Sequence, residues 1–230
     1  MSDDPIGYGQ YCPITRAVEV IGERWSLLIL RDLLIGSTRF NELARGAPGL
    51  SRSLLSKRLR QFERSGLVEH VDDQYLLTPA GHDLLPVVMA IGEWGARWAF
   101  GEPEPFELDA ELLVWWMHHR FDSTVLPDDR TVFQLRFADD PRLFWIVVEP
   151  VGASVCHADP GFEVDVVIRT DLRTMYEVWL GRLPVGAAVR SARLAFEGRR
   201  DITRRMGEVL HLSEVAPFVA AATADGTADR

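Results

Sequence analysis

Residues 51–65, with the sequence SRSLLSKRLRQFERS, combine two kinds of side chain on two sides of one predicted helix. Leu55, Leu59 and Phe62 recur at helical spacing, which predicts one buried stripe. The other side carries cations and hydroxyls, at Arg52, Ser53, Ser56, Lys57 and Arg60. Arginine and lysine donate hydrogen bonds to phosphates and guanine edges, and serine pairs with bases without bulk. This side therefore fits the major groove of a DNA duplex, although by itself it fits a solvated basic face equally well.

The elements around this helix distinguish the two interpretations. Ser51 is typical of a helix N-cap and Gly66 of a C-cap. Apolar periodicity predicts earlier helices at residues 13–21, 26–34 and 39–45. Two short strands are expected afterwards, at 67–71 and 75–77, followed by a helix from Pro79 towards Phe100. Helix, turn, basic helix and hairpin in this order predict a winged helix-turn-helix and favour DNA binding, with Ser51 and Arg39 adding contacts to the duplex.

The net charge of −9 argues against a nucleic-acid partner only until its distribution is considered. Residues 1–100 carry 11 basic and 12 acidic side chains, whereas residues 101–230 carry 14 and 22. The acidity therefore lies mainly in the second half of the chain. DNA binding requires a basic face rather than a basic total, so the charge does not exclude it.

The cellular compartment is predicted from what the chain lacks. No apolar run reaches the ~20 residues that span a bilayer, and the first residues, MSDDPIGYGQ, have no apolar signal-peptide core. The two cysteines, Cys12 and Cys156, are too few for a disulfide framework. A cytoplasmic protein without a membrane partner is expected.

The histidines and carboxylates give no support to enzyme function. His118 and His119 are adjacent and so point to different sides of a helix, while His157 and His211 are isolated. No spacing matches a zinc site, and no nucleotide-binding loop or nucleophile motif is present. We expect neither a catalytic residue, nor a metal, nor a cofactor.

Several separate motifs between residues 11 and 100 resemble the HxlR family of bacterial transcription regulators. They are Cys12-Pro13-Ile14, Gly22-Glu23-Arg24-Trp25, Leu28–Leu33 (LILRDL), Arg39-Phe40-Asn41-Glu42-Leu43, Gly66-Leu67-Val68 and Tyr75-Leu76-Leu77-Thr78-Pro79-Ala80-Gly81. One departure is the wing tip, Asp72-Asp73-Gln74, where the family usually carries basic residues. Its carboxylates would repel phosphates, so we do not expect the tip to approach the DNA backbone closely.

The resemblance implies a homodimer formed by the N-terminal helix and the helix after the wing. The corresponding apolar residues are Val18, Ile21, Ile91, Trp94 and Trp98. The alternative is that these residues form a core stripe within one chain. A two-fold dimer would bind a palindromic operator whose half-sites lie about one or two helical turns apart.

Cys12 lies where the family places a cysteine before proline, and in some relatives that residue senses oxidants or electrophiles. A reactive thiolate would need a nearby cation, for which Arg16, one turn along, is the candidate. The alternative is a small buried residue in the first helix. Cys156 is expected to be core filler in a strand.

Residues 108–216 resemble a sterol-carrier-protein-like domain through the strand Phe162–Arg169 (FEVDVVIR), the helix 172–180 after Thr170-Asp171, and Gly181-Arg182-Leu183-Pro184. Similar domains hold fatty-acyl or sterol-like ligands in a hydrophobic tunnel. Aromatic residues could line such a pocket, and the candidates are Trp115, Trp116, Phe133, Trp145 and Trp179. An ordinary core is the alternative. Trp115 and Trp116 are adjacent, so one of them is expected to be exposed.

The expected architecture is a two-domain α+β chain. Residues 1–100 form the winged helix-turn-helix and dimerisation domain, 101–107 a proline-containing linker, 108–216 the sterol-carrier-like domain with a mostly antiparallel sheet, and 217–230 a flexible tail. The expected function is a dimeric DNA-binding regulator controlled by a hydrophobic ligand. A thiol redox regulator acting through Cys12 and a lipid-binding carrier protein are the alternatives.

Overall fold

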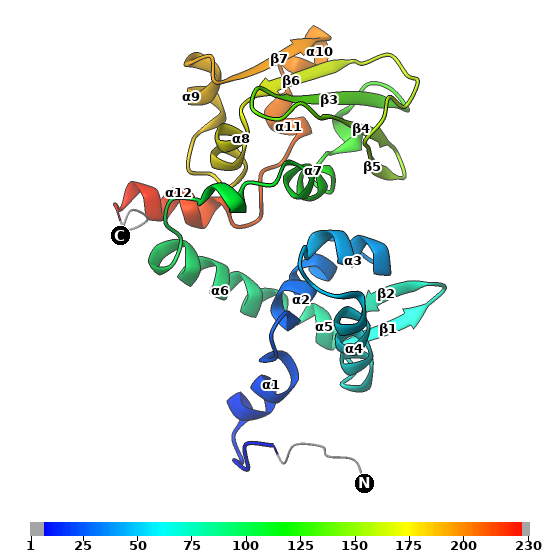
Figure 1. The fold of residues 1–230 in the computed structure, drawn as a ribbon, viewed down its shortest axis with the longest axis vertical. Coiled ribbons are helices and arrows are strands. Elements are labelled where there is room, and N and C mark those ends of the chain that lie inside the picture. The colour runs from blue at the N-terminus through cyan, green and yellow to red at the C-terminus, as the bar shows by residue number, and fades with distance from the viewer. Residues whose placement is uncertain (1–6, 227–230) are drawn as a thin grey trace. The chain divides into compact units, whose positions relative to one another are not determined.

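The computed structural model describes residues 7–226, and its contacts divide the chain into two compact units (Figure 1). The first unit ends at Val88 and the second begins at Met89, so the division falls inside helix α6 (Leu85–Trp98). The linker expected at 101–107 lies further along the chain. The ends of the expected first domain and tail, residues 1–6 and 227–230, lie outside the described residues.

The first unit contains the elements of a winged helix-turn-helix. These are α1 (Pro13–Ile21), α2 (Ser26–Leu34), α3 (Phe40–Gly46), α4 (Arg52–Arg64), β1 (Val68–Val71), β2 (Gln74–Leu77) and α5 (Pro79–His82), followed by the start of α6. The predicted winged helix-turn-helix is therefore confirmed. Local signals explain the boundaries: the Ser51 hydroxyl caps α4, Thr78 caps α5, and Pro79 takes the first position of α5.

The core of this unit forms where α4 packs its apolar stripe against the preceding helices. Leu55, Leu59 and Phe62 are completely buried, together with Ile29 and Leu30 of α2. The stripe predicted from the spacing is therefore confirmed.

The wing is a two-residue hairpin. Val71 pairs with Gln74, which leaves Asp72 and Asp73 as the turn, with φ angles of 48° and 62°. Both residues thus occupy the left-handed region, as the hairpin turn that matches strand twist requires. Aspartate tolerates this region better than most residues.

Asp32 of α2 is a buried carboxylate in the first unit. Its Oδ1 accepts a hydrogen bond of 2.9 Å from Arg31 Nε, whereas its Oδ2 is buried without a hydrogen-bond partner. A Cβ at Gly46 of α3 would lie 2.3 Å from Oδ2, so a larger residue there would displace the Asp32 carboxylate. Burial raises the pKa of Asp32 to about 6, against the opposing effect of the Arg31 guanidinium.

The second unit is built on a five-stranded sheet in the order β5-β4-β3-β6-β7. Its strands are β3 (Thr131–Phe137), β4 (Leu143–Glu149), β5 (Gly152–Cys156), β6 (Val166–Thr170) and β7 (Leu194–Gly198). All neighbouring pairs are antiparallel except β3 and β6, which are parallel. The prediction of an α+β unit with a mostly antiparallel sheet is therefore confirmed.

Helices cover one face of this sheet (Figure 1). The helices and turns of the unit are η1 (Pro105–Glu107), α7 (Ala110–His118), η2 (Ser123–Val125), α8 (Leu172–Trp179), α9 (Val185–Arg190), α10 (Arg200–Thr203), α11 (Met206–Val209) and α12 (Ala216–Ala224). Asp109 and Asp171 cap α7 and α8 with their carboxylates. The Tyr176 hydroxyl of α8 donates to the Asp109 carbonyl over 3.0 Å, which joins these two helices.

Four expectations for this unit are wrong. The strand expected at Phe162–Arg169 begins only at Val166, where β6 starts. The helix expected near residues 200–212 is two short helices, α10 and α11. The first part of the expected flexible tail is the helix α12, whose Val219 and Ala222 are buried. Neither tryptophan of the adjacent pair is exposed, because Trp115 is buried and Trp116 packs, half-buried, against the core.

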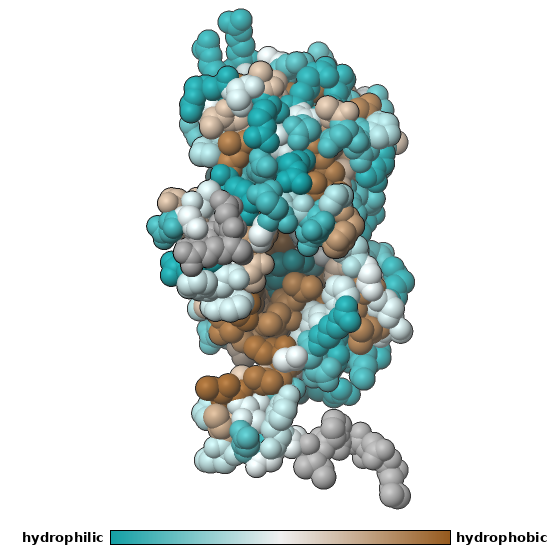
Figure 2. All heavy atoms as spheres, turned by 60° about the vertical axis from the view of Figure 1, so that its left-hand side comes forward, coloured by the Kyte–Doolittle hydropathy of each residue, from teal (hydrophilic) through white to brown (hydrophobic). Residues whose placement is uncertain are grey.

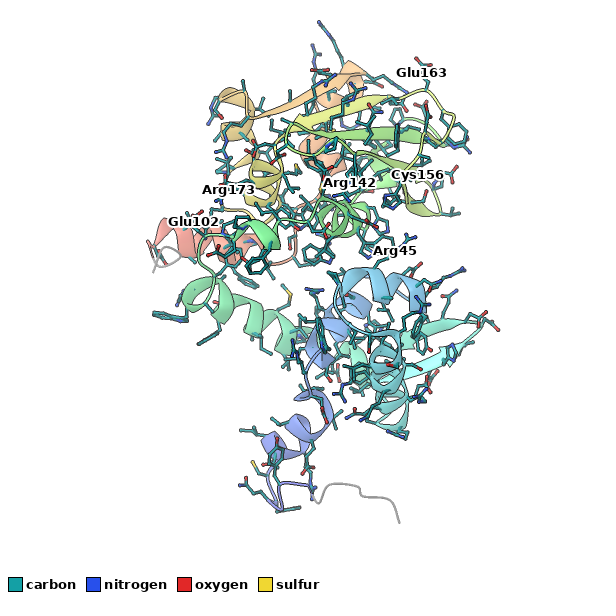
Figure 3. All side chains as sticks on the ribbon, viewed as in Figure 1. Arg45, Glu102, Arg142, Cys156, Glu163 and Arg173 are labelled. Carbon is teal, nitrogen blue, oxygen red and sulfur yellow. The ribbon has the colours of Figure 1, made fainter. Side chains whose placement is uncertain are left out.

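The segment expected as a linker is tied to the second unit. Arg173 Nη1 donates to Glu102 Oε2 over 2.8 Å, and these two residues lie together in Figure 3. Arg182, largely buried, also pairs with Glu102 and donates to the Gly101 carbonyl over 3.0 Å. Residues 105–107 form the short helix η1, so Pro105 begins a helical turn rather than continuing an extended spacer.

We predict that Asp32→Asn stabilises the protein at neutral pH. The pKa of Asp32 in the folded state lies above its ordinary value of 3.8, so the folded state binds this proton more tightly than the unfolded state. The stability that protonation contributes is complete below pH 4 and is lost as the pH rises through 6. Asparagine needs no proton, and we expect a gain of about 2–3 kcal/mol at pH 7.5 and about half of that at pH 5.

Urea unfolding of the full chain at both pH values measures this effect as the difference between variant and wild type. Asp83→Asn, at an exposed carboxylate of the same unit, is the matched control. An equal effect of Asp32→Asn at the two pH values would contradict the prediction.

Candidate nucleic-acid interface

The N-terminus of α4 and the turn before it define the candidate interface. Leu50 is buried and fixes the turn, while Ser51 turns its side chain outward and accepts from the Leu54 amide over 3.3 Å. The Ser51 and Ser53 hydroxyls lie 3.2 Å apart. The first turn of α4 therefore presents hydroxyls and the partial positive charge of a helix N-terminus to the solvent.

The cationic side of α4 is free of the protein's own core. Arg52, Ser53, Lys57 and Arg60 are exposed, and Ser56 is half-buried. Arg60 Nη1 donates to the Ser56 hydroxyl over 2.8 Å, which holds the Arg60 side chain along the helix. The face is thus open to a groove.

Arg52 is held from the neighbouring helix α3. Its Nη2 donates to Asn41 Oδ1 over 2.7 Å, and its guanidinium lies 4.9 Å from the centre of the Phe40 ring. Such a support limits the rotamers of Arg52 and so reduces the entropy that a contact with DNA would cost. Asn41 is an exposed polar residue that the sequence analysis did not assign to the interface.

Arg39 begins α3 and links it to the wing. Its backbone forms an antiparallel bridge with Gln74 of β2, and its amide donates to Glu42 Oε2 over 2.9 Å. The Tyr75 amide donates to the Thr38 carbonyl over 2.7 Å. The exposed Arg39 side chain is therefore carried by a well-braced strand-to-helix junction.

Three residues of α4 change the expected charge pattern. Arg58 is 5% exposed and points into the protein, since it lies three residues after Leu55 and four before Phe62 on the apolar stripe. Arg64 is exposed near the C-terminus, and Glu63, half-buried, brings a carboxylate to the same end of the cationic side. The spacing from Leu55 and Phe62 is the signal that would have identified Arg58 as an inward cation.

The wing adds negative rather than positive charge. Asp72 and Asp73 at its tip are exposed. Burial raises the pKa of Tyr75 on β2, and the nearby Glu63 carboxylate raises it further. The cations of the candidate interface are therefore carried by α4 and by Arg39 rather than by the wing.

Cys12 is the N-cap residue of α1 and is half-buried. The thiol makes no capping hydrogen bond, yet the amides of Thr15 and Ile14 lower its pKa. Arg16, the expected cationic partner, instead pairs with Glu19 over 3.0 Å. The helix N-terminus thus replaces the expected cation.

The residues expected at a dimer interface lie on apolar stripes of α1 and α6. On α6, Ile91, Trp94 and Trp98 are exposed, with Trp94 at 62%. On α1, Val18 is exposed and Ile21 half-buried. Figure 2 shows hydrophobic residues, in brown, gathered in the lower part of the face that it draws. Ile21 packs in part against the core of the first unit, as the alternative interpretation expects, whereas Val18, Ile91, Trp94 and Trp98 are exposed.

The expected ligand-pocket residues do not share one cavity. Phe133 and Trp179 belong to the core on the helix-covered face of the sheet. Trp145 lies on the opposite face with Val132 and Val147, because successive residues of a strand point to opposite sides. Trp145 therefore cannot line a pocket between the sheet and the helices, contrary to the expectation from the sequence.

Other functional classes receive no support from the described residues. Among residues 7–226 no group of three or more histidine, cysteine or acidic residues could hold a metal ion. The His118 ring contacts the Trp115 carbonyl, and burial lowers the pKa of His119 to about 4. No helix in this part of the chain is both long and apolar enough to cross a membrane.

This geometry defines the class of the first unit as a winged helix-turn-helix with a basic second helix. Comparisons with known proteins place it further. Residues 20–102 match the family described as HxlR-like helix-turn-helix. YvaP of Bacillus subtilis, an uncharacterized HTH-type transcriptional regulator, is 36% identical over 97 residues, which cover 39% of this chain and 90% of YvaP.

Other relatives are covered less completely. Rv3095 of Mycobacterium tuberculosis, another uncharacterized HTH-type transcriptional regulator, is 42% identical over 89 residues, 36% of this chain, and the match spans 56% of Rv3095. Quinone-bound YodB from B. subtilis, a solved structure, is 32% identical, with a TM-score of 0.36 and coverage of 38% of this chain and 99% of YodB.

The chain belongs to the HxlR-like helix-turn-helix family. The relatives are named as transcriptional regulators and not as enzymes. The family match ends at residue 102 and so leaves most of the second unit outside it.

Proposed function

We propose that the protein is a dimeric transcriptional regulator that inserts two copies of α4 into successive major grooves of a palindromic operator. The observation that carries this proposal is the exposed cationic side of α4, opposite a fully buried stripe. Arg52, Lys57 and Arg60 supply contacts to phosphates and bases, and Ser51, Ser53 and Ser56 add short hydroxyl contacts. Arg39 contacts the backbone from the start of α3.

We predict that Arg52→Ala and Arg60→Ala each weaken operator binding by roughly 1–3 kcal/mol where the side chain reads a base. The probe is the duplex that the wild-type protein selects from a randomised pool of 30 base pairs, compared with a scrambled duplex of equal composition. Fluorescence anisotropy at several salt concentrations gives both affinities. If the side chain contacts a phosphate instead, its loss weakens binding to both duplexes equally and lowers the slope of affinity against salt concentration by about one.

Arg190→Ala, at an exposed arginine of the second unit, is the matched control and should bind as wild type. If both α4 variants also bind the selected duplex like wild type, this side of α4 is not the DNA-reading surface. If the wild-type protein selects no duplex at all, the proposal of a DNA-binding regulator fails, and a lipid carrier becomes the better interpretation.

We also propose that the exposed stripes of α1 and α6 form the homodimer interface. On α6, Val87, Ile91, Trp94 and Trp98 follow one another at spacings of four, three and four residues and so lie on one side of the helix. Exposed tryptophans are costly in water and are typical of interface centres.

We predict that Trp94→Glu shifts the protein from dimer to monomer, because a charge in the centre of an apolar interface is desolvated without a partner. Sedimentation velocity over a range of concentrations measures the dissociation constant, which should rise at least a hundredfold. Glu93→Gln, next in sequence on α6, is the control. A monomeric wild type, or an unchanged dimer of Trp94→Glu, would remove this interface.

Control by a hydrophobic, fatty-acyl-like ligand is proposed for the second unit. The support is the resemblance of this part of the chain to sterol-carrier-like domains and the apolar layer between the sheet and helices α7 and α8. The side that holds Phe133 and Trp179 is the candidate site. A ligand would regulate DNA binding only if it favoured one dimer geometry over another.

We predict that native mass spectrometry of the purified chain detects a bound lipid-like species. Substitution of Met175, which is buried in this apolar layer, by tryptophan should reduce the occupancy of the ligand, because the added volume fills the space that a ligand needs. Thermal unfolding checks that the variant folds. A wild-type protein that carries nothing and is not stabilised by added fatty acids contradicts ligand control.

A second candidate function is thiol-based redox regulation through Cys12. The lowered pKa of this thiol at the start of α1 favours it, since the thiolate is the reactive species. We predict that Cys12→Ser abolishes any loss of DNA binding caused by diamide or a quinone, while Cys156→Ser leaves that loss unchanged. A response that persists in Cys12→Ser excludes this function.

A further inference from the structure

Arg58 is the one arginine of α4 that points into the first unit among the described residues of this helix. Its side chain is 6% exposed. Nη2 donates to Glu23 Oε2 over 2.5 Å, Nε to the Arg24 carbonyl over 3.3 Å, and Nη1 to Gln61 Oε1 over 3.1 Å. All three nitrogens of the guanidinium therefore have a partner, and two of them reach residues more than 30 positions away in the sequence.

Two of the partners of Arg58, Glu23 and the Arg24 carbonyl, lie at the tight corner between α1 and α2. A Cβ at Gly22, which follows α1, would lie 2.6 Å from the Val18 carbonyl oxygen, so the corner closes tightly on α1. Trp25, the residue before α2, has a φ of 75°, in the left-handed region that a tryptophan rarely adopts. A corner with these restraints has little freedom to move independently of α1.

We propose that the Arg58–Glu23 pair is a positioning device that fixes the DNA-reading helix α4 to the end of α1. This inference rests on the proposed function and deepens it. Arg58 cannot reach DNA from its buried position, so its charge serves the fold of the reading head. A buried guanidinium needs a counter-charge, and the Glu23 carboxylate supplies it from the corner.

The consequence concerns the spacing of the two reading helices. In the proposed dimer, α1 takes part in the interface, whereas α4 enters the groove. The link between α1 and α4 therefore sets the separation of the two copies of α4, and half-sites one or two helical turns apart require a defined separation. Non-specific binding depends on phosphate contacts and does not require this register.

The test uses Glu23→Gln, because the Glu23 side chain is 55% exposed and its amide replacement is compatible with the fold. Three probes are compared: the selected full-length duplex, a duplex with one half-site, and a scrambled duplex. We expect about tenfold weaker binding of the full-length duplex, less than twofold change on the other two, and an unchanged salt slope. Arg58→Lys, which keeps the charge but not the three-way geometry, should reproduce the loss.

Glu19→Gln is the matched control, since Glu19 lies on α1 and forms an exposed ion pair with Arg16. It should bind all three duplexes as wild type. Binding of the full-length duplex by Glu23→Gln at wild-type affinity overturns the proposal, and so does an equal loss on all three duplexes.

Hydrogen exchange gives a readout that does not require DNA. If Arg58 holds the corner, Glu23→Gln should increase amide exchange at residues 22–26 and in α4, with no increase in the second unit. Unchanged exchange there overturns the positioning role. If the wild-type protein selects no duplex, the proposed function fails, while this measurement still decides whether the pair fixes α4.

Discussion

The burial of Leu55, Leu59 and Phe62 determines which side of α4 meets the solvent. Each fully buried side chain of this size contributes about 1.5–3 kcal/mol, whereas repulsion between neighbouring cations on a helix surface costs only about 0.2–0.5 kcal/mol per pair. Packing therefore prevails over charge repulsion. A row of cations can be held together on the outer side before any DNA is bound, and the orientation of the reading face follows from the core.

The first unit was predictable because its signals are local. Apolar spacing, the Ser51 and Thr78 caps and the two-aspartate turn each act within a few residues, and each agrees with the others. What escaped prediction here depends on contacts across the unit. No role was assigned to Arg58 from the sequence, because its partner Glu23 lies 35 residues earlier and only the fold brings the two together. Its position on the apolar stripe was the only available indication.

The second unit was less predictable because its sheet is assembled from distant segments. The parallel pairing of β3 with β6 joins residues about 33 positions apart, and no turn chemistry specifies it. Alternation along β4 in the sequence is sufficient to place Trp145 and Phe144 on opposite faces of the sheet. The expectation that the aromatic residues line one pocket did not take this alternation into account. The helix α12 has local signals, a proline at its start and several alanines, but the burial of its Val219 and Ala222 depends on tertiary packing.

The acidic wing tip illustrates how a fold requirement can oppose a binding requirement. Its turn needs two residues with positive φ, and aspartate meets this need at the cost of repelling phosphates. A glycine or asparagine turn would satisfy the same backbone without the charge. In the proposed complex the tip contributes no attraction, so α4 and the start of α3 would supply the affinity for DNA. We therefore expect DNA binding to be more sensitive to the position of α4 in this protein than in a protein with a basic wing.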